Sequence, residues 1–515
     1  MTKRDARNLA VLFASLVALA LWRLDLAPIV TMEGIVGAGA RRMLAQGDWA
    51  VPHLYGEFYT FKPPLAWWLV AGSFRALGES AFTLRLPFAL VGAAIAPMTY
   101  ALVRAHTDAA RALVAGLAAT TGFLVLQKLR LAETDILLAF GAGGAMLAAS
   151  SALARGSWSR WSAAYALFAF GVLAKGAPGV LFFAPGLVVA SFALGRSREL
   201  VRARHAVPLV GALAVVGAWA WCAWQQSAGD AFAQPLAEAS DRASAWTWSR
   251  AGEALARPLL VLVLFLPWSA FLPSALLARP KSEFARAAAL FVVVGVVALM
   301  LVPRGSSRYF LPLTVPIGAL VGLHLPARRF ARFPHHDPSA LVDVGLALVG
   351  VAAIAVSAGV PGGRLPLDVR LIAFALGALA LFAAWRGLVR GDRLALALRL
   401  ALTALALWVI VVFGLDLRRA RRRSLDATAE RFRAHLAADD VLWVDLLDKH
   451  SNLFFLLDRD VRRFRLGVEL PPAGEWLVLE ERQEPALCEV PNRAVRLIER
   501  SAENQARLGL WRVER

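Results

Sequence analysis

Apolar segments recur along most of the chain, and short polar loops separate them. Two examples are "LAVLFASLVALALW" (9–22) and "ALRLALTALALWVIVVFGL" (397–415). A helix needs about 20 mostly apolar residues to cross a bilayer core, and lipid offers no partner to free backbone groups. The pattern therefore predicts an all-α polytopic membrane protein.

Counting the apolar runs of spanning length predicts about thirteen transmembrane helices. The runs lie near residues 9–30, 84–104, 111–128, 136–154, 161–174, 177–195, 207–226, 257–278, 287–303, 309–327, 340–359, 371–388 and 395–415. With the N-terminus inside, the strongly basic loops fall on the cytoplasmic side, as the positive-inside rule expects. Several charged residues at segment ends then share the opposite, extracytoplasmic side.

The first outer loop, residues 31–83, contains two apolar stretches that are too short to span a membrane. "MEGIVGAGARRMLAQG" (32–47) and "PPLAWWLVAGSFRALG" (63–78) have the spacing of amphipathic helices that lie in the membrane interface. Proline suits the first turn of the second helix, and its paired tryptophans suit the headgroup level. We therefore expect two interfacial helices in this loop.

The pattern changes after residue 415. "SLDATAERFRAHLA" (424–437) predicts a soluble amphipathic helix, and "DVLWVDLL" (440–447), "EWLVLEE" (475–481) and "RAVRLIER" (493–500) predict short strands. The chain is thus divided into a transmembrane domain, 1–415, and a C-terminal soluble α/β domain, 416–515. Thirteen crossings place the second domain outside, whereas the basic run Arg418–Arg423 favours the cytoplasm, so its side stays open.

Composition agrees with this interpretation, because 58% of the residues are hydrophobic and 18% are charged. The 56 Lys and Arg against 37 Asp and Glu do not indicate nucleic-acid binding, since most of the basic residues lie in short loops between apolar runs. The two cysteines, Cys222 and Cys488, make a disulfide framework improbable. We found no phosphate-binding glycine loop, metal spacing or nucleophile elbow.

Two carboxylates at membrane-surface positions are candidate catalytic groups. Glu33 follows the first apolar run, and Asp135 begins another within "LRLAETDILLAF" (129–140). Each is equally consistent with a first-turn carboxylate that interacts with the helix dipole. In the functional interpretation, one of them faces an outer cavity as a general base.

Cations on the same side suggest an anionic, lipid-linked substrate. Lys62 is also consistent with a lysine that reaches lipid headgroups, whereas Lys175 lies in the tight turn "LAKGAPG". Prolines interrupt the run after "PRGSSRYFLPLTVP" (303–316), as in helices broken near a cavity. The candidate phosphate-binding residues are Tyr59, Lys62, Arg85, Arg130, Lys175, Arg304, Arg308 and Tyr309.

An ordered set of motifs resembles a known family. "RRMLAQGDWAVPHLYGEFYTFKPPLAWWLVAGSFRALGESAFTLRLPFAL" (41–90) resembles the first outer loop of the aminoarabinose transferases and the related protein O-mannosyltransferases, which are GT-C glycosyltransferases. "RLAETDILLAF", "GVLAKGAPGVLFFAP", "FLPWSAFLP" and "SRYFLPLTVP" resemble later motifs of that family in the same order. The likeness covers roughly residues 30–320, and the tail weakly resembles the family's extracytoplasmic domain.

The resemblance carries over to individual residues. Asp135 matches the second conserved acid of the family, and the other matching positions are Tyr59, Lys62, Arg85, Lys175 and Tyr309. The chain also departs from the pattern: the leading D-E pair reads Met32-Glu33, and the glutamate before K-P-P is Phe61. Glu33 is then the remaining acid of the leading pair.

The resemblance implies a membrane glycosyltransferase that moves a sugar from a polyprenyl-phosphate donor to a lipid, glycan or protein acceptor. Its active site would face the periplasm from the inner membrane of a bacterium. A divalent metal is possible and no cofactor is indicated. Trp246 and Trp248 are weaker candidates for stacking on a sugar or acceptor, since interfacial anchoring suits them equally. Two alternatives stay open: a transporter or flippase, and an inactive relative, which Met32 and Phe61 favour.

Overall fold

The structure is a computed structural model of the 515-residue chain. It describes residues 2–232, 234–237, 240, 251–277, 282–302, 306–324, 338–358, 365–390, 396–422, 424–445, 450–464, 466, 470–487, 495–501 and 507–514. The chain forms two compact units. The helical unit comprises Met1–Trp22, Phe88–Trp219 and Leu236–Arg418, and the mixed unit comprises Arg23–Pro87, Ala220–Pro235 and Arg419–Arg515.

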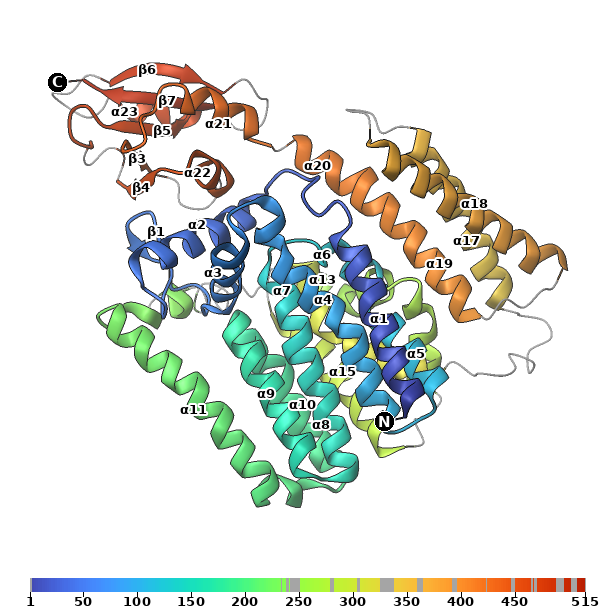
Figure 1. The fold of residues 1–515 in the computed structure, drawn as a ribbon. Coiled ribbons are helices and arrows are strands. Elements are labelled where there is room, and N and C mark those ends of the chain that lie inside the picture. Colours follow the sequence, from blue (N-terminus) through green and yellow to red (C-terminus); the bar gives the residue numbers. More distant parts are fainter. Residues whose placement is uncertain are drawn as a thin grey trace. The chain divides into compact units, whose positions relative to one another are not determined.

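The helical unit is a bundle of apolar helices (Figure 1). Its helices are α1 (Lys3–Leu21), most of α4 (Ala81–Arg104), α5 (Ala109–Thr120), α6 (Phe123–Lys128), α7 (Thr134–Leu138), α8 (Gly144–Arg155), α9 (Trp158–Lys175), α10 (Ala177–Ala193), most of α11 (Ala203–Gln226), α13 (Ala251–Leu264), α14 (Leu272–Leu277), α15 (Glu283–Leu301), α16 (Thr314–His324), α17 (Pro338–Ala358), α18 (Leu367–Arg390), α19 (Leu396–Val409) and the start of α20 (Leu417–Arg422).

Five described helices are long and apolar enough to cross a membrane, or six if the bent pair Ala254–Leu264 and Trp268–Leu277 is one span. In Thr134–Arg155, 94% of the most apolar stretch is buried inside the protein, whereas in Ala203–Gln226 only 11% of that stretch is buried. The first therefore lies at the centre of the bundle and the second at its edge. The mostly helical, apolar fold confirms the predicted class, whereas the count of thirteen spans and the interfacial orientation stay predictions.

A buried ion pair links two helices of this unit. Arg399 of α19 donates to Asp343 of α17, and both side chains are almost fully enclosed. Gly387 of α18 makes room for the pair, because a Cβ there would lie 2.3 Å from Asp343 Oδ2. A buried charge tolerates an apolar environment only when it is paired and hydrogen-bonded, so this contact fixes how the three helices approach one another.

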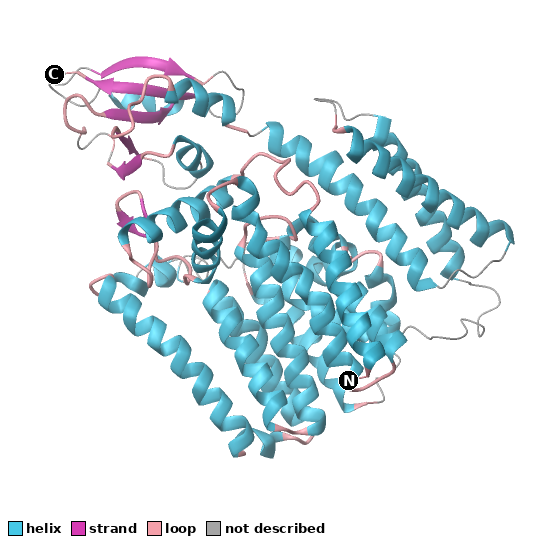
Figure 2. Ribbon diagram, in the orientation of Figure 1, coloured by secondary structure: helices cyan, strands magenta, loops and turns pink. Residues whose placement is uncertain are grey.

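The mixed unit combines residues 23–87 with the C-terminal segment, and its strands are drawn in magenta in Figure 2. Its elements are α2 (Thr31–Gln46), β1 (His53–Leu54), β2 (Glu57–Phe58), α3 (Leu65–Leu77), α21 (Asp426–Arg433), β3 (Val441–Val444), α22 (Ser451–Leu457), β4 (Asp460–Arg463), β5 (Trp476–Glu480), α23 (Glu484–Leu487), β6 (Val495–Arg500) and β7 (Leu508–Val513).

The C-terminal sheet has the strand order β4-β3-β5-β7-β6. β3 pairs in parallel with β4 and β5, and β7 pairs antiparallel with β5 and β6. Leu477, Leu479 and Val513 lie in the hydrophobic core of the sheet. The predicted helix and the three predicted strands are all present, and β4 and β7 are additional strands.

Close packing joins α2 to α22 within the mixed unit. A Cβ at Gly34 would lie 2.5 Å from the Asn452 nitrogen, and one at Gly37 would lie 2.4 Å from the Phe455 ring. Only glycine permits this approach, which brings α2 onto the C-terminal segment. The predicted boundary at residue 416 stays a prediction, since the contacts group Arg23–Pro87 with Arg419–Arg515.

Candidate functional site

The clearest cluster of charged groups in the helical unit is centred on Asp135. This residue lies in the first turn of α7, and a π-helical turn, Ala139–Gly143, follows directly. A Cβ at Gly141 would lie 2.5 Å from the backbone nitrogen of Gly171 in α9. This close contact brings the start of α7 to the end of α9. As a result, Asp135 Oδ1 accepts a hydrogen bond from Lys175 Nζ.

Lys175 is presented by the predicted tight turn. It is the last residue of α9, and α10 begins at Ala177. Gly176, between them, has φ +72° and ψ −131°, a conformation that glycine adopts without strain. The Lys175 side chain is only 10% exposed and its Nζ lies 4.8 Å from the Tyr309 ring centroid. The Asp135 carboxylate and the Tyr309 ring therefore both contact the buried ammonium group of Lys175.

A short 3-10 helix, Ser307–Leu313, adds two more predicted residues to the cluster. Arg308 Nε lies 4.0 Å from Asp135 Oδ2, and the Arg308 guanidinium lies 5.9 Å from the Tyr309 ring. The Arg308 side chain is 32% exposed, against 4% for Asp135. Arg308 is thus more accessible to an incoming anion than the other cation of the cluster, Lys175, which is 10% exposed.

Three neighbouring groups extend this site. Lys128 Nζ donates to Glu133 Oε2 at 2.8 Å, and both side chains are largely buried. Glu133 is the N-cap residue of α7. Thr134 Oγ1 is buried without a hydrogen-bond partner among the described residues. Nothing in the sequence marks this hydroxyl as a free hydrogen-bonding group.

Arg130 lies apart from this pairing, in an aromatic cage of the helical unit. Its guanidinium lies 5.6 Å from the Trp408 ring and 5.4 Å from the Phe413 ring, and Nη2 donates to the Trp22 carbonyl at 2.7 Å. The residue is 8% exposed. Cation–π contacts and a carbonyl therefore surround the arginine that was predicted to bind a phosphate.

Glu33 and Arg85 form a buried pair in the mixed unit. Arg85 Nε and Nη2 donate to Glu33 Oε1 and Oε2, both at 2.7 Å. Oε2 also accepts from the Val30 backbone at 3.1 Å. The remaining Arg85 protons go to the carbonyls of Leu24, Ala27 and Pro28.

This geometry argues against the predicted roles of both residues. Glu33 is 0% and Arg85 1% exposed, and all five N–H groups of Arg85 have acceptors. A general base needs access to the proton it removes, and a phosphate-binding arginine needs free donors. The pair instead fixes the entry of α2 against the start of α4.

The other predicted residues lie as follows. Tyr59 is buried, with its ring 5.4 Å from Phe61 and 5.7 Å from Trp67. Lys62 is half-buried just before α3, whose N-cap residue is Pro64. Arg304, Trp246 and Trp248 lie outside the described residues.

A metal does not fit the site as described. Among the described ranges, no group of three or more His, Cys, Asp or Glu side chains gathers to hold an ion. The central carboxylate, Asp135, is already flanked by two cations, which oppose a further positive charge.

Comparison with known proteins supports the family resemblance. Residues 61–224 match the family described as dolichyl-phosphate-mannose-protein mannosyltransferase. Residues 61–224 are thus similar to a glycosyltransferase family of the kind that the motifs indicated. This match confirms the resemblance. The matched range includes Lys62, Asp135 and Lys175.

Particular relatives are arabinosyl transferases. The undecaprenyl phosphate-alpha-4-amino-4-deoxy-L-arabinose arabinosyl transferase of Pseudomonas aeruginosa is 28% identical over 344 residues, which cover 61% of this chain and 59% of that protein. The match therefore spans less than two thirds of the relative's length. Crystal structures of ArnT from Cupriavidus metallidurans, bound to undecaprenyl phosphate and apo, share the fold. Their TM-scores are 0.75 and 0.73, each at 20% identity, with 98% of this chain covered and 97% and 98% of the ArnT chains.

Proposed function

We propose that the protein is an integral membrane glycosyltransferase. It transfers a sugar from a polyprenyl-phosphate donor to a hydroxyl or phosphate of a lipid, glycan or protein acceptor on the extracytoplasmic side of a bacterial inner membrane. The observation that carries this proposal is the largely buried cluster of Asp135 and Lys175 with the partly exposed Arg308 and Tyr309 in the helical unit. The family match at residues 61–224 supports it.

The cations of this cluster suit the leaving group. When the bond between the anomeric carbon and the phosphate oxygen breaks, the electron pair leaves with the polyprenyl phosphate. Lys175 and Arg308 stabilise this growing negative charge, and they do so more strongly in a water-poor site than in water. Lys62 is a further phosphate ligand in this proposal, because it matches the lysine of the family's K-P-P motif.

The carboxylate supplies the base. An acceptor hydroxyl gives its proton to Asp135 while its oxygen attacks the anomeric carbon from the side opposite the phosphate. Both oxygens of Asp135 face a cation in the described structure, at Lys175 and Arg308. Binding of the donor phosphate draws these cations away from the carboxylate and leaves it able to accept the proton.

The test measures sugar transfer by the purified full chain with a panel of labelled polyprenyl-phosphate sugars and a native membrane extract as acceptor. Lys175→Met should lower kcat/KM by about 100-fold or more, the usual effect of losing one group that stabilises transition-state charge. Lys62→Ala should also cause a large loss. Lys3→Met is the matched control, because Lys3 is exposed at the start of α1, and it should transfer at the normal rate.

Three results would contradict the proposal or the role of this cluster in it. If the chain binds a donor tightly yet transfers from none, it is an inactive relative. If it moves the intact lipid-linked sugar across vesicles without releasing label, it is a flippase. Equal rates for Lys175→Met and the normal chain would remove the cluster from the reaction.

A further inference from the structure

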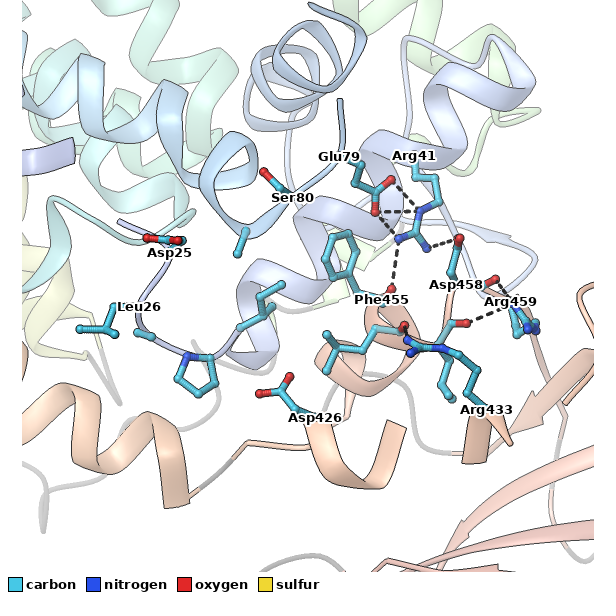
Figure 3. Close-up of a pocket in the computed structure, with 16 residues that line it drawn as sticks. Asp25, Leu26, Arg41, Glu79, Ser80, Asp426, Arg433, Phe455, Asp458 and Arg459 are labelled. Carbon is cyan, nitrogen blue, oxygen red and sulfur yellow. Dashed lines mark hydrogen bonds and ion pairs between the residues drawn. The ribbon is translucent and has the colours of Figure 1, made fainter. Parts of the chain in front are cut away.

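The mixed unit contains a cavity of about 800 Å³ that the proposed reaction does not use. The chain segment Asp25–Ile29 forms one wall, and residues of α21 and the end of α22 form the other (Figure 3). Leu26, Pro28 and Phe455 contribute apolar surface, while charged side chains of both signs line the rest. The cavity is therefore large enough and polar enough for a small charged ligand.

One arginine of the cavity is fully engaged. Arg41 forms an ion pair with Glu79 through Nε and Nη2, a second with Asp458 at 2.7 Å, and donates to the Phe455 carbonyl at 3.1 Å. A single guanidinium thus bridges two carboxylates within the protein (Figure 3). Its donors are engaged there, so Arg41 does not serve as an anion-binding group of the cavity.

Two other arginines have no carboxylate partner among the described residues. Arg433 donates to the Leu456 carbonyl at 2.5 Å, and Arg459 donates to the carbonyls of Leu457 and Asp458 at 3.3 and 3.0 Å. Arg459 Nε is buried without a hydrogen-bond partner in the described ranges. A guanidinium that meets only carbonyls keeps its full positive charge and is suited to bind a phosphate.

Two carboxylates of the cavity likewise have no directly paired cation among the described residues, and both act electrostatically at longer range on the buried Arg85. Asp25 makes no hydrogen bond or ion pair with any described residue. Asp426 Oδ2 accepts from the neighbouring Ser424 hydroxyl at 2.6 Å, and the Asp426 backbone N–H donates to that hydroxyl at 3.2 Å. Both line the cavity (Figure 3). In that view they lie toward the left and lower part of the cavity, whereas Arg433 and Arg459 lie toward the right.

We propose that this cavity binds a zwitterionic phosphate ester that carries a primary ammonium group, the chemistry of an ethanolamine headgroup. The phosphate lies at Arg433 and Arg459, and the ammonium lies at Asp25 and Asp426. A purely anionic ligand would leave the two carboxylates without a directly paired cation, and a purely cationic ligand would leave the two guanidinium groups without a directly paired anion. A zwitterion satisfies both ends with charge-assisted hydrogen bonds.

The test measures binding to the full chain in detergent, independently of sugar transfer. Equilibrium dialysis with labelled glycerophosphoethanolamine tests a soluble ester, and native mass spectrometry with phosphatidylethanolamine tests a lipid. Phosphatidylcholine and phosphatidylglycerol are the comparison ligands, since the first has no N–H donor and the second has no cation. The ethanolamine ligands should bind at least about tenfold more tightly than either.

Matched variants locate the site. Arg433→Gln and Asp25→Asn should each weaken ethanolamine binding by about tenfold or more. Arg431→Gln, on the same helix but outside the cavity, and Asp439→Asn, an exposed carboxylate, should bind as the normal chain does. Thermal unfolding of each variant confirms that the chain is folded at the assay temperature.

The binding results distinguish a site for the headgroup from a site for an intact membrane lipid. Selective binding of both the lipid and the soluble ester assigns the site to the headgroup, and selective binding of the lipid alone assigns it to a membrane lipid whose chains lie along Leu26 and Pro28. Either result supports the proposal when both variants weaken it. Equal affinity for phosphatidylglycerol, no binding at all, or binding that Arg433→Gln and Asp25→Asn leave unchanged would overturn it.

Discussion

The Glu33–Arg85 pair offers the sharpest test of how the two predicted acids differ. Glu33→Gln keeps an amide oxygen that can accept from the Val30 backbone, but it removes the charge that compensates Arg85. If Glu33 anchors α2, this change destabilises the protein. If Glu33 is a general base, the same change leaves the fold intact and removes activity.

The expected magnitude follows from burial. Both side chains are essentially unexposed, and removing one partner of a buried pair costs about 3–5 kcal/mol because the other charge stays buried and unpaired. Arg85→Met should cost at least as much, since the carbonyls of Leu24, Ala27 and Pro28 also lose their donors. The double variant should destabilise by less than the sum of the two single changes.

The assay compares thermal unfolding of purified variants in detergent with sugar transfer measured well below their unfolding temperatures. Glu283→Gln is the control, because its partner Arg196 is 41% exposed and Glu283 itself 32% exposed. That solvent-screened pair should contribute at most about 1 kcal/mol. A Glu33→Gln protein with normal thermal stability and no sugar transfer would refute the anchoring role.

Two further predictions concern the helical unit. Gly387→Ala should lower the unfolding temperature, because its Cβ would meet the Asp343 carboxylate at 2.3 Å. Gly345→Ala is the control, because a Cβ there meets open space and should leave the unfolding temperature unchanged. Equal unfolding temperatures for the two variants would contradict the close packing of Gly387 against Asp343. Burial, with nearby positive charge, lowers the pKa of His106 from 6.5 to about 4. The neutral imidazole therefore contributes its full stabilisation above pH 6.5, and this stabilisation is lost as the pH falls from 6.5 toward 4. At pH 5 the free energy of unfolding falls by up to about 2 kcal/mol, and solvent screening reduces this figure. His106→Asn can still bond the Ser151 hydroxyl, and it should flatten the pH profile of the unfolding temperature.

The sequence predicted the C-terminal elements well because their patterns are local. The strands β3, β5 and β6 carry runs of apolar residues between polar turns, and α21 carries a helical period. β4 is an edge strand whose sequence, Asp460–Arg463, has a single apolar residue, so it gives no strand pattern. The predicted run 111–128 is divided between α5 and α6, and its hydropathy alone does not reveal the break.

The sequence indicated that Asp135, Lys175, Arg308 and Tyr309 share one side of the membrane, because the number of crossings fixes sides. It did not indicate which acid meets which cation. Pairing depends on the rotation of each helix about its axis, and uniformly apolar segments carry little information about that rotation. Arg85 therefore seemed available for a phosphate, although its five donors are all used within the mixed unit.

Glu33 and Asp135 have different partners, and this difference predicts the order in which the substrates bind in the proposed reaction. Glu33 is paired with Arg85, so the base in our proposal is Asp135, whose oxygens face Lys175 and Arg308. A carboxylate held between two cations is a weak proton acceptor, because taking the proton removes the attraction to both. The donor phosphate must therefore engage the cations before the acceptor loses its proton. Initial-rate kinetics should accordingly show ordered binding with the polyprenyl-phosphate sugar first, and random order would mean that Asp135 is free of its cations without the donor.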